Sequence, residues 1–262
     1  MFETTRFEAE RLAPSSVVIG ASIAAFGGMM TLIAPGILGD VDLETLFEQL
    51  PAAMVEQMGL GHMGTLEGFI AIELYEYVWL LGLGAYLSYL AGGTIAGDVE
   101  NGRMDTLLAA PVSRARLLVE RYLALLTPIV VVNVAVFVGV YGATLVIEET
   151  IPLVDLAAVH ALSVPYLLAC GAFGMGVSVV APRRRIAEGV AAGTIIGTFL
   201  LELLVSGTDV SWLGAIAPMR YYDPLAILTE SVYDPVGAGI LLVAAIVLLG
   251  GSGWLFGEVD VQ

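Results

Sequence analysis

The sequence 96-AGDVENGRMDTLLAAPVSRARLL-118 decides the fold, because it places charged residues between two long apolar runs. Three of its apolar residues follow the i, i+3, i+4 spacing of one helix face: Met104, Leu107 and Leu108. Gly102 is placed to end the preceding helix, and Pro111 to end the short one. Ser113 is placed as the N-cap of the helix that follows. The pattern predicts a short helix between two membrane spans, either docked on a soluble partner or lying among lipid headgroups.

The same stretch resembles the loop after the second span of type-2 ATP-binding cassette (ABC) transporter permeases, the membrane subunits of ABC exporters. The strings AGDVENG, DTLLAAPVSR and LLVERYL carry this resemblance. Asp98 stands where the family usually has Glu, and Arg103 stands where Thr usually follows the glycine. With six spans around the loop, the resemblance covers nearly the whole chain. It implies that the loop couples the permease to a separate ATPase subunit through Asp98, Glu100, Gly102, Met104, Leu107, Leu108, Pro111, Ser113 and Arg114.

The composition excludes an ordinary soluble domain. Hydrophobic residues make up 58% of the 262 residues, the mean hydropathy is +0.90, and only 14% of the residues are charged. The charges cluster between apolar runs of about 20 residues, the length that crosses a bilayer as a helix. All ten basic residues are arginine, against 26 acids. This acid-rich, lysine-free composition resembles that of proteins from salt-loving organisms such as halophilic archaea.

Six apolar runs predict an all-α polytopic membrane protein, with one permease domain over residues 1–262. The expected spans are 17–38, 77–95, 123–147, 156–180, 186–205 and 236–256. Residues 1–13 mix apolar and charged positions and predict a short interfacial helix that ends before Pro14. The leader is acidic rather than basic, so the first span is expected to remain in the mature protein. An apolar stripe in the outer loop 39–68 predicts two short surface helices.

Several residues within and between the spans carry further predictions. A four-residue glycine repeat in the fifth span lets another helix approach closely: Gly189, Gly193 and Gly197. The pattern leaves packing within one subunit and packing between subunits equally open, but members of the resembled family work as dimers, with this span near the interface. Asn133 predicts a hydrogen bond across helices in the third span. Arg220 and Asp223 predict a local ion pair in the last outer segment.

The arginines predict the orientation. Nine of the ten fall on one face of the six-span topology, and Arg220 falls on the other. The positive-inside rule assigns the nine-arginine face and both termini to the cytoplasm of a multi-pass cell-membrane protein. Ten acids leave that face with a net charge of −1, whereas sixteen acids leave the outer face at −15. The negative charge of the outer face is better explained as an adaptation to salt and solubility than as a cation-binding site.

Catalysis by this chain is not expected. A phosphate-binding loop needs GxxxxGK[ST], and the sequence has no lysine, so we expect ATP and magnesium on the partner ATPase and no cofactor here. The two histidines and Cys170 are too far apart to predict a zinc cluster. Four ionisable groups are expected near the outer, water-accessible ends of their spans: Glu73, Glu76, His160 and Glu202. An ion-coupled secondary transporter and a non-transporting scaffold or sensor subunit remain alternatives. Membrane lipids and a second permease copy, as homodimer or heterodimer, are the other expected partners, and nucleic acid is not.

Overall fold

The computed structural model describes residues 3–40, 47, 55, 59–104, 113–147 and 149–258. Six helical stretches in these ranges are long and apolar enough to cross a membrane, and none of the described elements is a strand. The six stretches are α1 (Glu3–Asp40), α4 to α5 (Leu66–Glu100), α7 to α8 (Arg114–Ile147), α9 (Leu153–Val180), α10 (Arg184–Val205) and α12 (Pro235–Glu258). The predicted all-α polytopic architecture is confirmed.

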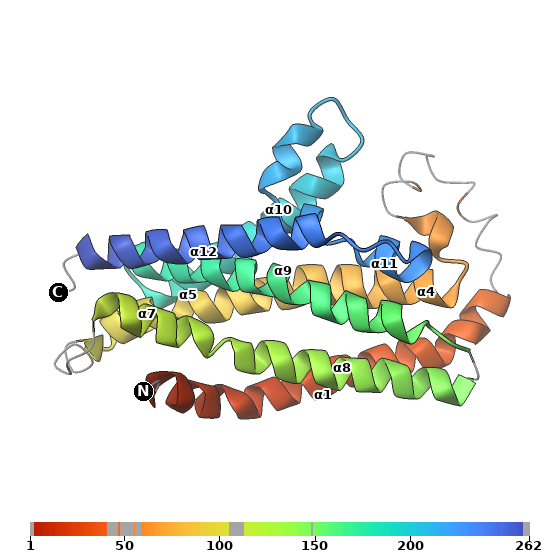
Figure 1. Cartoon of the computed structure of the whole chain (residues 1–262), viewed down its shortest axis with the longest axis horizontal. Coiled ribbons are helices and arrows are strands. Elements are labelled where there is room, and N and C mark those ends of the chain that lie inside the picture. The colour runs from red at the N-terminus through yellow and green to blue at the C-terminus, as the bar shows by residue number, and fades with distance from the viewer. Residues whose placement is uncertain are drawn as a thin grey trace.

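The spanning helices form an elongated bundle, in which α1 begins and α12 ends at the same end (Figure 1). An even number of crossings requires this arrangement. The most extensive packing joins α1 to α8, α5 to α9 and α10, and α9 to α12. The end of α10, together with the segment that follows it, projects from the side of the bundle (Figure 1). The loop between α5 and α7 therefore lies at the same end as both termini of the helical bundle.

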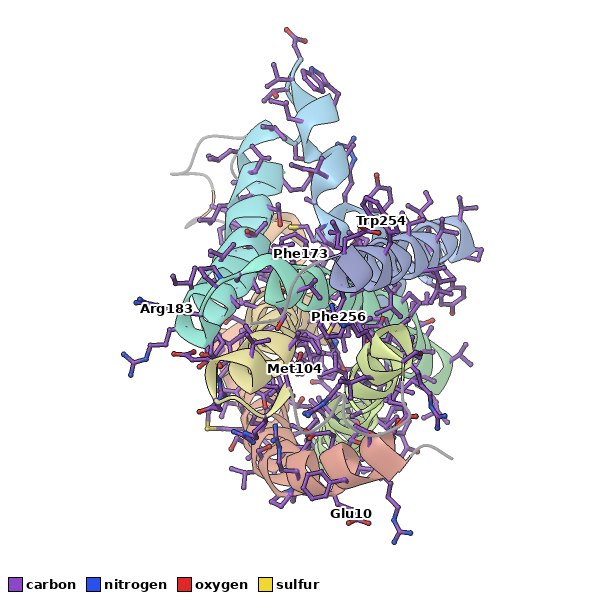
Figure 2. All side chains as sticks on the ribbon, turned by 90° about the vertical axis from the view of Figure 1, so that its left-hand side faces the viewer. Glu10, Met104, Phe173, Arg183, Trp254 and Phe256 are labelled. Carbon is purple, nitrogen blue, oxygen red and sulfur yellow. The ribbon has the colours of Figure 1, made fainter. Side chains whose placement is uncertain are left out.

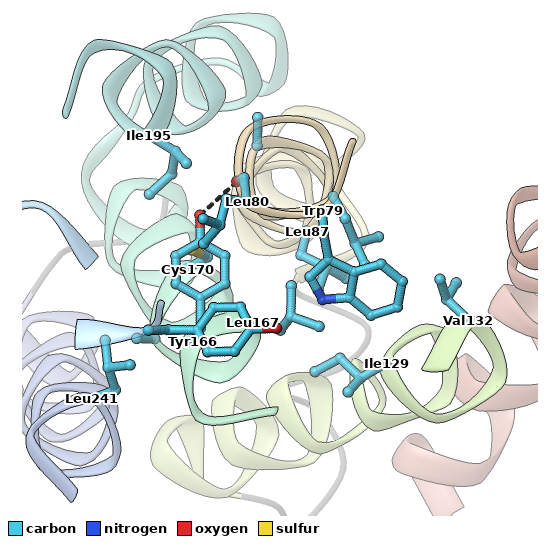
Figure 3. Close-up of a cluster of buried hydrophobic side chains, with 14 of the residues drawn as sticks. Trp79, Leu80, Leu87, Ile129, Val132, Tyr166, Leu167, Cys170, Ile195 and Leu241 are labelled. Carbon is cyan, nitrogen blue, oxygen red and sulfur yellow. Dashed lines mark hydrogen bonds between the residues drawn. The ribbon is translucent and has the colours of Figure 1, made fainter. Parts of the chain in front are cut away.

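Aromatic residues fill the centre of the bundle, where Tyr75, Trp79 and Tyr166 are fully buried. The hydroxyl of Tyr166 in α9 donates a hydrogen bond of 2.6 Å to the carbonyl oxygen of Leu80 in the second span (Figure 3). Gly84 makes room for this ring, since a Cβ atom at that position would overlap the Tyr166 hydroxyl. The phenol thus satisfies a backbone acceptor inside an apolar core while its ring packs between helices.

The first helix differs from the prediction at Pro14. Helix α1 continues through Pro14 and Pro35 for 38 residues, so the predicted break before Pro14 is wrong. A proline removes one backbone donor, but it holds φ near the helical value. The neighbouring Ser16 hydroxyl donates to the Leu12 carbonyl oxygen at 2.7 Å. The N-terminal segment is therefore helical, as expected, but is continuous with the first span.

The second span is longer than the predicted range 77–95. It joins α4 (Leu66–Ile70), the π-helix η2 (Ala71–Leu83) and α5 (Gly84–Glu100) into 35 residues. Thr65 caps its start, and its hydroxyl accepts from the Gly68 N–H at 3.1 Å. The acidic residues near its start, Glu67, Glu73 and Glu76, shortened the predicted span, but the helix carries them as half-buried side chains. Before it lies the short η1 (Leu60–His62), while most of the region of the two predicted surface helices lies outside the described residues.

The third span is divided into α7 (Arg114–Leu123) and α8 (Leu126–Ile147). Pro128 has no N–H to donate to the Ala124 carbonyl oxygen, which instead accepts from the Thr127 N–H at 3.1 Å. This tighter turn interrupts the regular helix at the point where the charged α7 enters the apolar α8. The division separates a polar helix beside the loop from the membrane-spanning part.

Candidate coupling site

Both ends of the loop between the second and third spans have well-defined helix caps. Gly102 has a φ of +65°, and its N–H donates to the Val99 carbonyl oxygen at 3.0 Å. The Arg103 N–H donates to the Asp98 carbonyl oxygen at 2.9 Å, which completes a Schellman cap. On the far side, the Ser113 hydroxyl accepts from the Arg116 N–H at 3.3 Å and caps α7. The roles predicted for Gly102 and Ser113 as helix caps are confirmed.

A buried arginine joins the two ends of this loop to the N-terminal helix. The Arg121 guanidinium in α7 contacts Asp98 of α5 through Nη2 at 2.6 Å and Glu8 of α1 through Nη1 at 2.6 Å. All three side chains are at least nine-tenths buried. Arg11 also contacts Glu8, at 3.1 Å. A buried ion pair of this kind requires good geometry to offset the loss of hydration, and it fixes three elements in one arrangement.

Two further residues tie the loop region to the rest of the bundle. Glu100 accepts a hydrogen bond of 2.8 Å from the Arg184 N–H at the start of α10. The Arg114 guanidinium donates to the Phe256 carbonyl oxygen at 2.9 Å and lies 5.7 Å from the centre of the Phe256 ring. Phe256 and Met104 lie at the end of the bundle that faces the viewer in Figure 2. Glu100 and Arg114 thus anchor the loop to α10 and α12.

The predicted docking face is only partly described. Met104 is 2% exposed and packs in the apolar core, so the expectation that its side chain faces a partner needs correction. Its side chain packs inward against the bundle. Leu107, Leu108 and Pro111 lie outside the described residues.

The glycine repeat of α10 faces away from its own chain. A Cβ atom built on Gly189, Gly193 or Gly197 would have no described atom within 4 Å. All three positions are exposed, and so are the nearby side chains of Val190 and Ile196. The stripe therefore makes no helix contact within the described part of the chain.

The ionisable side chains of the spans are partly buried, contrary to the expectation that all of them reach water. His160 and Glu202 are only 6% and 9% exposed. The Nδ1 and Nε2 atoms of His160 lie 3.0 Å from Asn133 Oδ1 and 3.0 Å from the Tyr75 hydroxyl, respectively. Because the amide oxygen only accepts, Nδ1 donates to it. Asn133 therefore bonds across helices, as predicted.

The segment after α10 forms η3 (Ser211–Ile216), η4 (Pro218–Tyr221) and α11 (Pro224–Glu230). The predicted pair of Arg220 with Asp223 is wrong. Asp223 accepts from the Ala226 N–H at 2.9 Å and caps α11, whereas the Arg220 guanidinium lies 3.8 Å from the Glu202 carboxylate. The carboxylate occupies space that a side chain on Gly214 would fill. Arg220 therefore joins this segment to α10 instead of forming a local pair.

Sequence reasoning missed Arg121 and Glu8 as parts of this site. Arg121 stands in the string LLVERYL, where a charge among apolar residues suggests a buried partner. Glu8 lies 113 positions earlier, and no local spacing connects the two. Within the described residues, no group of three or more His, Cys, Asp or Glu side chains is placed to hold a metal ion.

Comparison with protein families agrees with this arrangement. A family model described as "ABC-2 family transporter protein" matches residues 17–261. No curated protein matches the chain. The family match covers all six spans except the first residues of α1, and it includes the whole loop between α5 and α7.

Proposed function

The chain belongs to the ABC-2 transporter family and is a membrane permease subunit of an ABC transporter; from this premise we propose that it is an exporter permease driven by a separate ATPase. The observation that carries the proposal is the loop between α5 and α7, capped at both ends and joined to α1 by the Arg121 ion pairs. A segment held in this way transmits a displacement to several spans at once. ATP and magnesium would be bound by the ATPase subunit.

The docking contact of the proposal is the apolar pair Leu107 and Leu108, with Met104 as its buried anchor. Binding and closing of the ATPase would move this segment, and the caps at Gly102 and Ser113 would pass the movement to α5 and α7. The alternative is that the pair rests among lipid headgroups and binds no protein. Both arrangements leave the bundle folded, so folding does not distinguish them.

The variant Leu108→Asp distinguishes them. A charge placed in a buried apolar contact costs several kcal/mol, so the ATPase should no longer co-purify with the permease, and transport should be lost. The control is Leu153→Asp, because Leu153 is 51% exposed at the start of α9, at the other end of the bundle. The measurement is co-purification of the co-expressed ATPase with membrane-inserted permease. Retention of the ATPase by Leu108→Asp at the level of the control would refute the docking contact.

We also propose that a second permease copy covers the glycine repeat of α10. The support is that Gly189, Gly193 and Gly197 are exposed and have open space above them, which suits close approach of another backbone. Gly193→Leu should therefore separate the copies. Gly250→Leu in α12 is the matched control, since Gly250 is exposed and also has open space above it. The oligomer is measured after mild detergent extraction, and an unchanged dimer in Gly193→Leu would place the repeat against lipid.

The proposed topology has both termini and the loop between α5 and α7 in the cytoplasm. It is supported by nine arginines at that end and one, Arg220, at the other. An origin in a halophilic archaeon is proposed on the composition, which has 26 acids and ten arginines but no lysine. Acidic surfaces remain hydrated and soluble in concentrated salt, which screens their mutual repulsion.

A further inference from the structure

A small cavity with basic walls lies between α1, α5, α7 and α10, beside the loop that carries the proposed coupling segment. Its volume is about 50 Å³, and its charged lining consists of Glu8, Arg11, Asp98, Arg103, Arg121 and Arg184. One water molecule needs about 10–15 Å³ by the same kind of measure, so the space holds a larger group. The cavity is distinct from the docking contact, which is assigned to the loop itself.

The charged lining of the cavity is basic, because four arginines face two acids, Glu8 and Asp98, which gives a net charge of +2. Glu8 and Asp98 balance Arg11 and Arg121, with which they form ion pairs. Glu188 balances Arg184 at 2.7 Å, while Glu100 accepts from the Arg184 backbone N–H. Arg103 is exposed at the rim and makes no ion pair with the described residues. Arg103 is therefore the lining cation that is placed to meet an anion.

Arg121 also leaves a hydrogen-bond donor unused. Its side chain is 6% exposed, its Nη1 and Nη2 atoms bind the two carboxylates, and its Nε atom has no partner among the described residues. A buried donor without a partner is costly, and this Nε atom is enclosed by the chain itself and not open to the cavity. Guanidinium groups favour phosphate and carboxylate oxygens as acceptors.

The remaining wall of the cavity is mostly apolar. Leu12, Leu90 and Leu125 contribute to it together with Thr94, and Gly93 and Gly97 let Glu188 and Arg184 of α10 approach α5 closely. A cavity lined by both basic groups and leucines suits an amphiphile better than a fully hydrated ion. Basic pockets between spanning helices on the cytoplasmic side are suited to anionic lipid headgroups.

We propose that this cavity binds a phosphate group, supplied by the headgroup of an anionic phospholipid in the cytoplasmic leaflet. Arg103 would be the main donor, and the leucines would meet the start of the acyl chains. The assignment of the leaflet rests on the proposed topology. Binding itself requires no ATPase, so its failure is distinguishable from failure of the coupling proposal.

The test is native mass spectrometry of the full chain in detergent, with phosphatidylglycerol, phosphatidylcholine or inorganic phosphate added separately. The wild type should retain phosphatidylglycerol at least about tenfold more tightly than phosphatidylcholine. Arg103→Gln should lose about tenfold in affinity, which is one charge-assisted contact. Arg183→Gln is the matched control, because Arg183 is exposed, does not line the cavity and points away from the bundle (Figure 2).

Competition with inorganic phosphate identifies the source of the group. If phosphate displaces the lipid only weakly, the headgroup is the ligand. If phosphate binds and phosphatidylglycerol does not, the site takes a phosphate group from solution and the lipid assignment is wrong. Equal retention of the two lipids with no binding of phosphate, or an Arg103→Gln variant that behaves like Arg183→Gln, would overturn the proposal.

Discussion

Replacing Arg121 with leucine tests whether the buried ion pairs hold the loop region together. Arg121 lies 2.6 Å from both Asp98 and Glu8. In Arg121→Leu, Glu8 keeps its contact with Arg11 at 3.1 Å, but Asp98 loses its ion-pair partner while staying buried. Removing one partner of a buried pair costs about 3–5 kcal/mol, because the other charge is left without compensation.

The expected change is measurable as a shift in the unfolding midpoint. A protein of this size loses about 2–4 °C per kcal/mol, so Arg121→Leu should unfold roughly 6–20 °C below the wild type. Cys170 offers the assay, since it is the one cysteine in the sequence and is 0% exposed. A fluorogenic maleimide will react with its thiol only as the bundle opens on heating.

A matched exposed pair provides the control. Arg6 and Glu10 lie 2.8 Å apart, but their side chains are 83% and 65% exposed. Arg6→Leu should therefore change stability by less than about 1 kcal/mol. Asp98→Asn added to Arg121→Leu should recover about half of the loss or more, because it removes the uncompensated charge. A midpoint for Arg121→Leu within 2 °C of Arg6→Leu, or no recovery in the double variant, would refute the reasoning.

Two other predictions concern topology and the spans. Single cysteines are placed at Glu48 and at Asp105 in a background without the native thiol and treated with a membrane-impermeant thiol reagent in intact cells. The site at Glu48 should be labelled and the site at Asp105 should not, and labelling of the Asp105 site alone would reverse the proposed orientation. Asn133→Leu and His160→Phe should each cost about 1–3 kcal/mol in thermal unfolding, because each leaves a buried polar partner unsatisfied. The double variant should be more stable than the sum of the two losses, and strict additivity would contradict the hydrogen bond between them.

The spans and the caps of the loop could be predicted from the sequence, because their causes are local. Long apolar runs specify membrane helices, and Gly102 and Ser113 act within one helical turn of their positions. The errors arose where local signals were ambiguous. The sequence predicts that a helix ends before Pro14, but Pro14 lies inside α1. A proline at a helix boundary and a proline within a long helix leave the same local pattern, so the sequence alone does not distinguish them.

The partners of charged residues could not be predicted, because they are set by helix packing. Arg220 was assigned to Asp223, three residues away, but it lies by Glu202 of another helix. Glu8 was interpreted as part of an interfacial helix, whereas it is buried against Arg121. In a bundle of six spans, residues at the same depth become neighbours whatever their separation in sequence, and a single sequence carries no local signal of depth-matched pairs.

Buried ion pairs join the helices at the loop end of the bundle, whereas the exposed face of α10 is mostly apolar. Apolar packing alone would stabilise α1 against α8 without a buried ion pair, and such pairs are often replaceable by apolar groups at no loss of stability. An ion pair, however, fixes the distance and direction between its two charged groups, whereas apolar side chains can pack in several relative positions. Arg121 contacts α1 and α5 from α7, so under the proposed function a displacement of the loop would move the three helices together. The exposed apolar face of α10 has no comparable attachment along its length, and its described ion pairs lie near its two ends, at Arg184 and Glu202. Under the proposed function, buried ion pairs would therefore hold the helices together beside the ATPase, whereas the exposed face of α10 would meet the second copy through apolar side chains and glycines.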